Sequence, residues 1–539
     1  MKKPLISLVL ALFIPLFSGC SKNYKHAYVD RTKIITEIKN TEEKPRLLVN
    51  LDGDHWNNYL NKLSKKEDLN DNDVKELVSW YTNTDITDLM FNIFDQCSNT
   101  KTDVMTFRGD MYKNGVQGSN IKDYSFFEWN YKIIEEKGID AFELWFNECR
   151  NNNINPWITI RMNDCHGSED ADSIFRGDLF FKAKQNEWML GKNYGHQRIC
   201  LNYEIKEVRD YFLNYIKEQI THYDVYGLEL DFLREIYCFD YIQSDNEKIV
   251  GIMNGFISEV NDIRKEAEDK WGHEIKLTAR MCRDIEQAYV FGFDVKTWDK
   301  QNLVDSITMT PRGESCDSAM PLAYWKEQLP NTEIYAGIET NVLKSDGISH
   351  ATAEVVNAYA AQYLTAGADG IYLFNYYKTS PTGKRSDEVF SSFKSIGDVL
   401  NSNRRHIVTY QDTTPKDYEP YSPLPIKLKF NKKVSLDIET GLIPENRKVA
   451  VIIGTDSKKI SKFRVNLNNS ELSYVGETKI HGSSGGDLTT EDAYAPVGTN
   501  LYLFECSLTK FENNVQKLGF VSTHLFAKHI TYIELSIAS

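Results

Sequence analysis

The stretch YGLELDF, residues 226–232, alternates apolar Leu228 and Leu230 with acidic Glu229 and Asp231. An alternation with a period of two is typical of a β-strand, because successive side chains of a strand point to opposite faces. The leucines suit packing against helices, whereas the other face aims two carboxylates into an interior. Buried carboxylates are costly unless they are paired or used on a ligand. This strand therefore predicts a sheet whose inner face lines a functional site.

Seven further strand candidates flank this stretch, separated by longer segments with helical periodicity. They are residues 46–52, 88–94, 156–163, 275–281, 306–312, 334–340 and 370–377. The intervening EVRDYFLNYIKEQI (207–220) repeats apolar residues at spacings of three and four, which favours a helix. Eight such units predict an α/β fold, a (β/α)8 TIM barrel over residues 45–400. A doubly wound open sheet is the alternative, but LDGDHW (51–56) stands where its glycine fingerprint would lie.

The pattern of secondary-structure signals in the sequence changes beyond residue 405. Short alternating segments such as KVAVIIGTD (448–456), TNLYLFECSL (499–508) and ITYIELSI (530–537) are separated by Pro, Gly and Asn turns. Short strands with turn residues of this kind predict an all-β, β-sandwich accessory domain over residues 405–539.

The first twenty residues, MKKPLISLVLALFIPLFSGC, have a charged start, an apolar run and small residues before Cys20. This pattern indicates an export signal, and its apolar run is shorter than the about 20 residues of a membrane span. The end, FSGC, resembles the lipobox of bacterial lipoproteins, which implies lipidation of Cys20. We therefore expect a lipid-anchored protein of the bacterial cell envelope, facing the periplasm or the cell surface, with residues 21–44 as a polar tether. A plain cleaved signal is the alternative.

The composition excludes some partners and cofactors. Against 63 Lys and Arg stand 77 Asp and Glu, a formal net charge of -14, which disfavours nucleic acid as a partner. Eight cysteines follow Cys20 without a CxxC pair, so zinc ribbons and thioredoxin-like redox sites are disfavoured. An exported protein either pairs some of these cysteines or keeps them as buried thiols, and no cofactor is expected. No later stretch is long and apolar enough to cross a bilayer, so membrane contact is expected through the lipid alone.

Alternate residues of a barrel strand face the interior, and on the inward-facing positions of these strands polar side chains gather at the C-terminal ends. Barrel enzymes carry their active sites at these ends. The candidates are Arg161, Asn163, Glu229, Asp231, Arg280, Arg312, Glu339, Asn375 and Tyr377. Three acids and three arginines in so small a space predict ion pairs or ligand contacts. Asp231 lies nearest the rim and is the candidate catalytic residue, with Glu339 across the barrel as its partner. For Glu229 and the arginines, a structural ion-pair network is the alternative to substrate binding.

Three segments together resemble a known family. YDVYGLELDFLRE (223–235), LNYEIKEVRDYFLNYIKEQI (201–220) and NEWMLGK (186–192) are similar to the glycosyl-hydrolase-like barrel lipoproteins of bacteria, over about residues 45–400. The fourth strand of that family reads roughly Y-D-v-D-G-i-x-x-D, and Tyr226 stands here at the aspartate before the glycine. The resemblance implies the barrel and a role in carbohydrate chemistry. It carries Asp231 over as the candidate catalytic carboxylate.

Glycosidic cleavage commonly needs two carboxyl groups, about 5–5.5 Å apart for retention and 6.5–9.5 Å for inversion. Sugars also stack on aromatic rings, for which Trp56, Trp188, Tyr376 and Tyr377 are candidates, with ordinary packing as the alternative. Further substrate-binding candidates are Arg234, one turn after Asp231, and the histidines His55 and His166. A metal site formed by these histidines with Asp52, Asp54 and Asp164 matches no standard spacing, and no metal is predicted.

The first functional hypothesis is an exported glycoside hydrolase acting on a complex polysaccharide or glycan. The alternative is a catalytically silent carbohydrate-binding or surface glycan-utilisation protein on the same barrel. A metal-dependent deacetylase or hydrolase using His55 and His166 is a third class. Two opposed carboxylates favour the first hypothesis, and one acid ringed by arginines favours the second. The arginines either bind a uronate or sulfated sugar or neutralise Glu229, Asp231 and Glu339.

Overall fold

A computed structural model of the chain describes residues 41–115, 127–167, 176–233, 235–311, 320–344, 347–376, 387–408, 423–455, 463–479, 500–506, 511, 514–523 and 528–539. Four residues singled out above, Cys20, Arg234, Arg312 and Tyr377, lie outside these ranges, as does the tether up to residue 40. None of the helices in the described ranges is long and apolar enough to cross a membrane.

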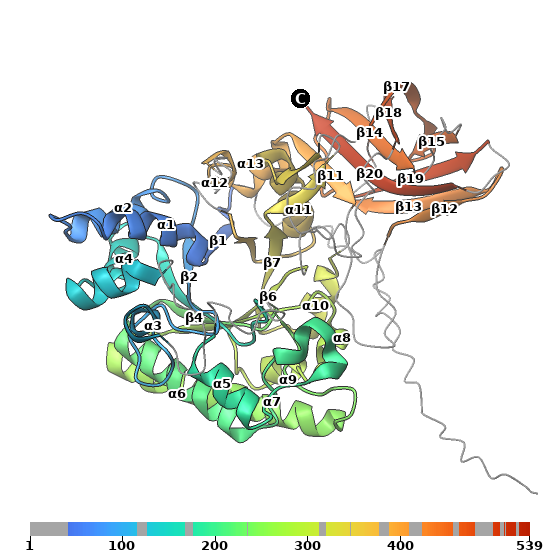
Figure 1. Ribbon diagram of the computed structural model, residues 1–539. Helices are drawn as coiled ribbons and strands as arrows, with labels where there is room; N and C mark the ends of the chain where they lie inside the picture. Colours follow the sequence, from blue (N-terminus) through green and yellow to red (C-terminus); the bar gives the residue numbers. More distant parts are fainter. Residues whose placement is uncertain are drawn as a thin grey trace, which may run out of the picture.

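Eight parallel strands close into a barrel in the order β1-β10-β7-β6-β5-β4-β3-β2 (Figure 1). Each barrel strand pairs with the barrel strands that precede and follow it in the chain, β10 pairs with β7 across the intervening β8 and β9, and β10 closes the ring against β1. The strands are β1 (Arg46–Leu51), β2 (Asp88–Phe94), β3 (Asn155–Arg161), β4 (Gly227–Asp231), β5 (Lys276–Met281), β6 (Ser306–Met309), β7 (Glu333–Glu339) and β10 (Gly370–Phe374). All eight predicted strands are present, so the predicted TIM barrel is confirmed.

Helices follow the strands and cover the outside of the barrel (Figure 1). In chain order they are α1 (Gly53–Leu63), α2 (Asp71–Ser79), α3 (Arg108–Asn114), η3 (Asn130–Glu136), α4 (Ala141–Asn151), α5 (Asp178–Gln185), η4 (Lys192–Ile199), α6 (Lys206–His222), α7 (Asn246–Trp271), α8 (Ile285–Val290), α9 (Val295–Lys300), α10 (Leu322–Gln328), α11 (Ala353–Thr365), α12 (Asp387–Phe390) and α13 (Ile396–Asn401). The helix expected at 207–220 is α6. The hairpin of β8 (Asn341–Lys344) and β9 (Gly347–His350), after β7, was not predicted.

The two faces of each strand differ as the parity rule requires. Leu228 and Leu230 are fully buried in the large core between barrel and helices. A separate apolar layer lies inside the barrel, formed by Leu48, Met90, Trp157, Tyr335, Tyr372 and Phe374. Below it, Asp88 accepts hydrogen bonds from Arg46 Nη2 at 2.5 Å and from Trp157 Nε1 at 2.8 Å. The interior is thus a packed core with a polar layer at its N-terminal end, as in other barrels of this type.

Gly337 on β7 marks a close approach of two strands. A Cβ atom at this position would lie 1.7 Å from Cγ2 of Thr310 and 3.1 Å from the carbonyl oxygen of Met309. Only glycine avoids that contact, so this position lets Thr310 point into the barrel beside β7.

The C-terminal part is a two-sheet domain beside α11 and α13 (Figure 1). One sheet has the order β11-β20-β14-β18-β17, with β12 also on β20, and the other has the order β13-β19-β15-β16. The strands are β11 (Arg404–Val408), β12 (Ile426–Leu428), β13 (Lys433–Glu439), β14 (Lys448–Thr455), β15 (Phe463–Leu467), β16 (Ser470–Glu471), β17 (Ser473–Lys479), β18 (Asn500–Cys506), β19 (Val515–Ser522) and β20 (Lys528–Ala538). An apolar core fills the space between the sheets, which confirms the predicted β-sandwich.

The sandwich packs tightly on the barrel. Ile407, Leu501 and Tyr532 belong to the large core of the barrel, and the Tyr359 hydroxyl of α11 donates a hydrogen bond to the carbonyl oxygen of Ile407. Gly441 has a φ of 65°, and a Cβ there would lie 2.5 Å from the carbonyl oxygen of Ala361. The two parts therefore share buried surface.

Candidate active site

Two carboxylates meet one guanidinium at the C-terminal mouth of the barrel. Asp231, the last residue of β4, accepts hydrogen bonds from Arg280 Nη1 at 3.0 and 3.2 Å. Glu339, the last residue of β7, lies 3.6 Å from Arg280 Nη2. All three side chains are buried. The terminal nitrogens of one guanidinium are about 2.3 Å apart, so these carboxylate oxygens lie within about 9 Å of each other.

Arg280 is held in place by more than charge. Its guanidinium carbon lies 3.9 Å from the centre of the Phe374 ring, a cation–π contact from the last residue of β10. Burial by itself would lower the pKa of Arg280, but the Asp231 carboxylate, followed by Tyr372 and Glu339, raises the pKa above its ordinary value. The guanidinium therefore stays charged and fixes both carboxylates in the mouth.

Asp231 has a further donor that orients it. The backbone N–H of Leu233 donates to Asp231 Oδ1 at 3.1 Å, because the chain turns sharply after β4. Donors on one guanidinium and one peptide group stabilise the negative charge and leave the carboxylate one orientation.

Glu229 lies one layer deeper in the barrel, on the same face of β4. Its Oε1 accepts hydrogen bonds from the Thr159 hydroxyl and the Tyr372 hydroxyl, both at 3.0 Å, while Oε2 is buried and accepts no hydrogen bond within the described part of the chain. Complete burial, and then the nearby charge of Asp231, raise the pKa of Glu229 from 4.5 to about 8. Glu229 is therefore protonated at neutral pH, and the alternative of a structural role fits it better than contact with substrate.

Arg161 is the centre of a second cluster, at the ends of β1, β2 and β3. Its guanidinium lies 3.2 Å from both Asp52 and Asp164 and 4.0 Å from Asp95. Arg108 also pairs with Asp95. Arg161 and Arg280, the two described members of the three predicted barrel arginines, are thus paired with carboxylates of the protein itself. These contacts fit the prediction that the arginines neutralise nearby acids better than the prediction that they bind an anionic sugar.

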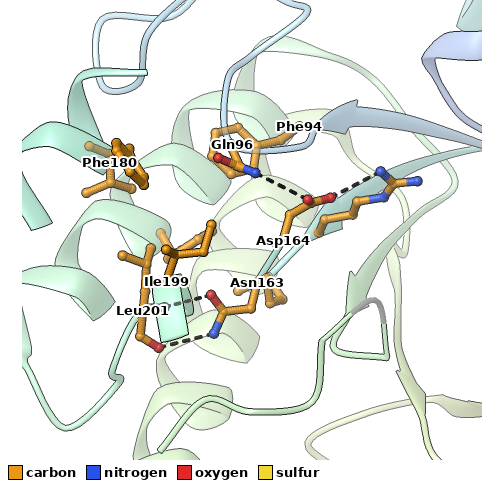
Figure 2. Close-up of a pocket in the computed structure, with 11 residues that line it drawn as sticks. Phe94, Gln96, Asn163, Asp164, Phe180, Ile199 and Leu201 are labelled. Atoms are coloured by element: carbon orange, nitrogen blue, oxygen red, sulfur yellow. Dashed lines mark hydrogen bonds and ion pairs between the residues drawn. The ribbon is translucent and has the colours of Figure 1, made fainter. Parts of the chain in front are cut away.

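A small cavity lies beside the second cluster (Figure 2). Asp164 stands between Gln96 and Arg161, and the Asn163 side chain exchanges hydrogen bonds with the backbone of Leu201 in the long connection after β3. The cavity measures about 30 Å³, enough for water, whereas ligand pockets usually measure about 300–1,000 Å³. Asn163 therefore positions this connection in the present geometry.

The two histidines lie at the mouth as predicted, but each contacts nearby groups of the protein itself. His55 Nδ1 accepts from the backbone N–H of Asp52 at 3.1 Å, its Nε2 lies 3.4 Å from the carbonyl oxygen of Tyr376, and burial lowers its pKa. His166 Nδ1 lies 2.6 Å from Asp164 Oδ1, with about a third of the side chain exposed. Within the described ranges, no three His, Cys, Asp or Glu side chains are grouped so as to hold a metal ion.

The two candidate tryptophans differ in how deeply they are buried. Trp56 is fully buried and packs against Phe91, Phe142 and Trp145 behind the barrel wall, so it belongs to the core and offers no ring face to a sugar. This corrects its assignment as a substrate-binding residue, which followed from its place just after a strand. Trp188 is half-buried against the core.

Asn375 and Tyr376 follow β10 at the mouth. Asn375 takes a positive φ of 57°, and its side-chain oxygen is buried and accepts no hydrogen bond from the residues that the structure describes. Tyr376 is buried, and its hydroxyl donates to the backbone carbonyl of Glu339 at 2.7 Å. Tyr376 thus supports the end of β7 rather than presenting a ring.

Sequence reasoning missed Asp95, Tyr372 and Phe374. Asp95 stands directly after the strand at 88–94, and Asp52 is the last residue of the predicted strand at 46–52, so the rule that strand ends converge would have found Asp95. Tyr372 and Phe374 have the inward parity of their strand, but aromatic residues there are ordinary core residues in sequence, and nothing in their spacing distinguishes them.

Comparisons with known proteins found no matching family model and no matching curated protein. Similar solved structures include a family 18 N-acetylglucosaminidase from Paenibacillus barengoltzii (TM-score 0.36, 9% identity, 64% of this chain and 99% of that one). A second is chitinase ChiW from Paenibacillus sp. (TM-score 0.39, 10% identity, 87% and 53%). A third is a cycloisomaltooligosaccharide glucanotransferase from Paenibacillus sp. (TM-score 0.33, 10% identity), of which this chain spans 58%.

Proposed function

We propose that the protein is a glycoside hydrolase that cleaves glycosidic bonds in a complex polysaccharide or glycan, with Asp231 and Glu339 as its two catalytic carboxyl groups. The observation that carries the proposal is their arrangement, buried at the C-terminal ends of β4 and β7 and bridged by Arg280. Glycosidic cleavage commonly needs such a pair, and the upper limit of about 9 Å on their separation is compatible with the spacing used for retention and with most of the range used for inversion.

The contacts distinguish the two carboxyl groups. Asp231 accepts hydrogen bonds from Arg280 and from the N–H of Leu233, and these donors favour a carboxylate in a fixed orientation. Such a carboxylate suits the nucleophile, or the base that activates water. Glu339 lies farther from Arg280, at 3.6 Å, and is the better placed of the two to carry a proton to the leaving oxygen. Arg280 would then be a positioning residue that keeps the two groups apart and aligned.

A library of polysaccharides and glycans tests the proposal. Incubation with the purified protein, followed by product analysis, is expected to show new reducing ends with at least one glycan, and the anomeric configuration of the first product then assigns retention or inversion. If several glycans bind and none is cleaved, the hydrolase proposal is wrong.

One observation favours a second candidate, a silent carbohydrate-binding protein. Arg280 occupies the space between the two acids, as in a structural ion-pair network. A silent protein would bind the same glycan equally well after Asp231→Asn and would release no product before or after the change, so binding and product release measured together separate the two candidates.

We also propose that the protein is exported and anchored through lipid on Cys20, as a member of the barrel lipoproteins that it resembles. The support is the sequence FSGC at residues 17–20 after an apolar run. Cys20→Ala is expected to move the protein from the membrane fraction to the soluble fraction. A variant that stays with the membrane would contradict the proposed anchor.

A further inference from the structure

Two cysteine side chains touch in the long connection after β3. The sulfur atoms of Cys165 and Cys200 lie 3.0 Å apart, and both residues are buried. This separation is about 1 Å longer than a disulfide bond of about 2.05 Å. A small side-chain adjustment therefore brings the sulfur atoms to bonding distance.

The backbone holds the two cysteines in this position. Two residues before Cys165, the Asn163 side chain accepts from the N–H of Leu201 at 2.9 Å and donates to the Leu201 carbonyl oxygen at 3.1 Å. The carbonyl oxygen of Cys200 in turn accepts from the N–H of Leu190 at 3.0 Å. The hydrogen bonds that join these segments do not involve the sulfur atoms, so the thiol contact results from how the connection folds.

We propose that Cys165 and Cys200 form an intrachain disulfide in the exported protein. The two thiols lose two protons and two electrons, and a low-molecular-weight disulfide of the glutathione type accepts them by exchange and leaves as two thiols. The inference relies on the proposed export, because disulfides persist in oxidising compartments. Burial and the Cys165 thiol raise the pKa of Cys200, so the exchange takes place during folding, before this region closes.

The cross-link has a clear place in the architecture. It joins the two ends of the connection between β3 and α6, and the chain neighbours of the two cysteines, Asp164, Ile199 and Leu201, line the cavity of Figure 2. Asp164 and His166 flank Cys165, and His166 Nδ1 lies 2.6 Å from Asp164 Oδ1 at the mouth. The disulfide would restrict the unfolded chain by closing a loop of about 35 residues and would hold this rim of the mouth in place.

Cys238 is the competing partner. The Asn163 amide donates to Cys238 Sγ at 3.7 Å, so the Cys238 sulfur lies in the same region, but the sulfur that contacts Cys200 Sγ at 3.0 Å is that of Cys165. The chemistry of the region thus allows one specific pairing and one alternative, and peptide mapping can distinguish them.

The test uses the full chain. The protein is reduced and unfolded, refolded in a buffer of reduced and oxidised glutathione, quenched with acid, alkylated and digested. We expect a linked peptide containing Cys165 and Cys200, two fewer alkylated thiols than in the reduced protein, and a thermal midpoint about 5 °C higher than that of the reduced protein.

Matched variants make the result specific. Cys165→Ser should abolish the linked peptide and the effect of reductant on the thermal midpoint, whereas Cys149→Ser, which alters a buried cysteine on α4, should leave both unchanged. Full alkylation of Cys165 and Cys200 after refolding would overturn the proposal, and so would a Cys200–Cys238 peptide. No step requires glycosidase activity, so the result is independent of the proposed function.

Discussion

Glu229→Gln should change how the stability of the protein depends on pH. In the folded protein the pKa of Glu229 is raised to about 8, against 4.5 for the ordinary side chain, chiefly by burial. The folded state therefore binds a proton that the unfolded state has already released between these two values. By linkage, this contribution is fully present below about pH 4.5 and is lost as the pH rises through about 8.

The size of the effect follows from the same two values. Each unit of difference in pKa corresponds to about 1.4 kcal/mol, so the free energy of unfolding of the parent should fall by on the order of 5 kcal/mol across this range because of Glu229 alone. Glutamine is neutral and nearly isosteric, its oxygen can accept from Thr159 and Tyr372, and its amide replaces the protonated Oε2. The free energy of unfolding of the variant should therefore not show this fall as the pH rises.

Urea unfolding of parent and variant at several pH values measures the difference. The stability of the variant relative to the parent should rise with pH up to about pH 8 and then level off. Glu259→Gln, an exposed glutamate on α7, is the matched control, because it removes a charge without altering the barrel interior. A difference between parent and Glu229→Gln that stays constant from pH 5 to pH 8 would refute the reasoning.

Three further substitutions separate the site from its scaffold. Arg280→Met leaves Asp231 and Glu339 buried without their shared cation and should lower the free energy of unfolding in urea by about 3–5 kcal/mol. Arg280→Lys should lower it less. Equal stability of the parent and Arg280→Met would contradict the role of Arg280 as the bridge between the two acids. Trp56→Ala removes a buried core ring and should cost about 3–5 kcal/mol while glycan affinity stays unchanged, so a selective loss of affinity would restore Trp56 to the site. Asp88→Asn should lower stability by about 2 kcal/mol but leave turnover unchanged, because Asp88 lies at the opposite end of the barrel, and a large fall in turnover would speak against that separation.

Much of the fold was predictable because the barrel imposes a simple alternation on the sequence. On β4 the leucines contact the helices and the acids point inward, as the period of two requires. The same rule placed Arg161 and Arg280 among the acids. The hairpin of β8 and β9 was not predicted, because its strands NVLK and GISH are only four residues long and show no sustained alternation of apolar and polar residues.

The partners of each charged residue were harder to predict. Parity places Arg161 and Glu229 on the same inner surface, but it does not say that Arg161 pairs with Asp52 and Asp164 while Glu229 stays protonated. That choice depends on the tilt and stagger of the strands, which set the height of each residue in the barrel. Trp56 was misassigned for a related reason, since one helical residue after a strand end can point either over the mouth or behind the wall.

The turnover of Asp231→Asn on a glycan that the parent cleaves tests the central claim most directly. The substitution is nearly isosteric and removes the charge that Arg280 and the N–H of Leu233 hold in place. With the circular dichroism spectrum of the parent retained, and with Asp88→Asn as the buried aspartate control, we expect kcat to fall by about 10³-fold or more. Near-normal turnover in the folded variant would contradict the assignment of Asp231, and loss of the fold would show that its carboxylate serves the ion-pair network instead.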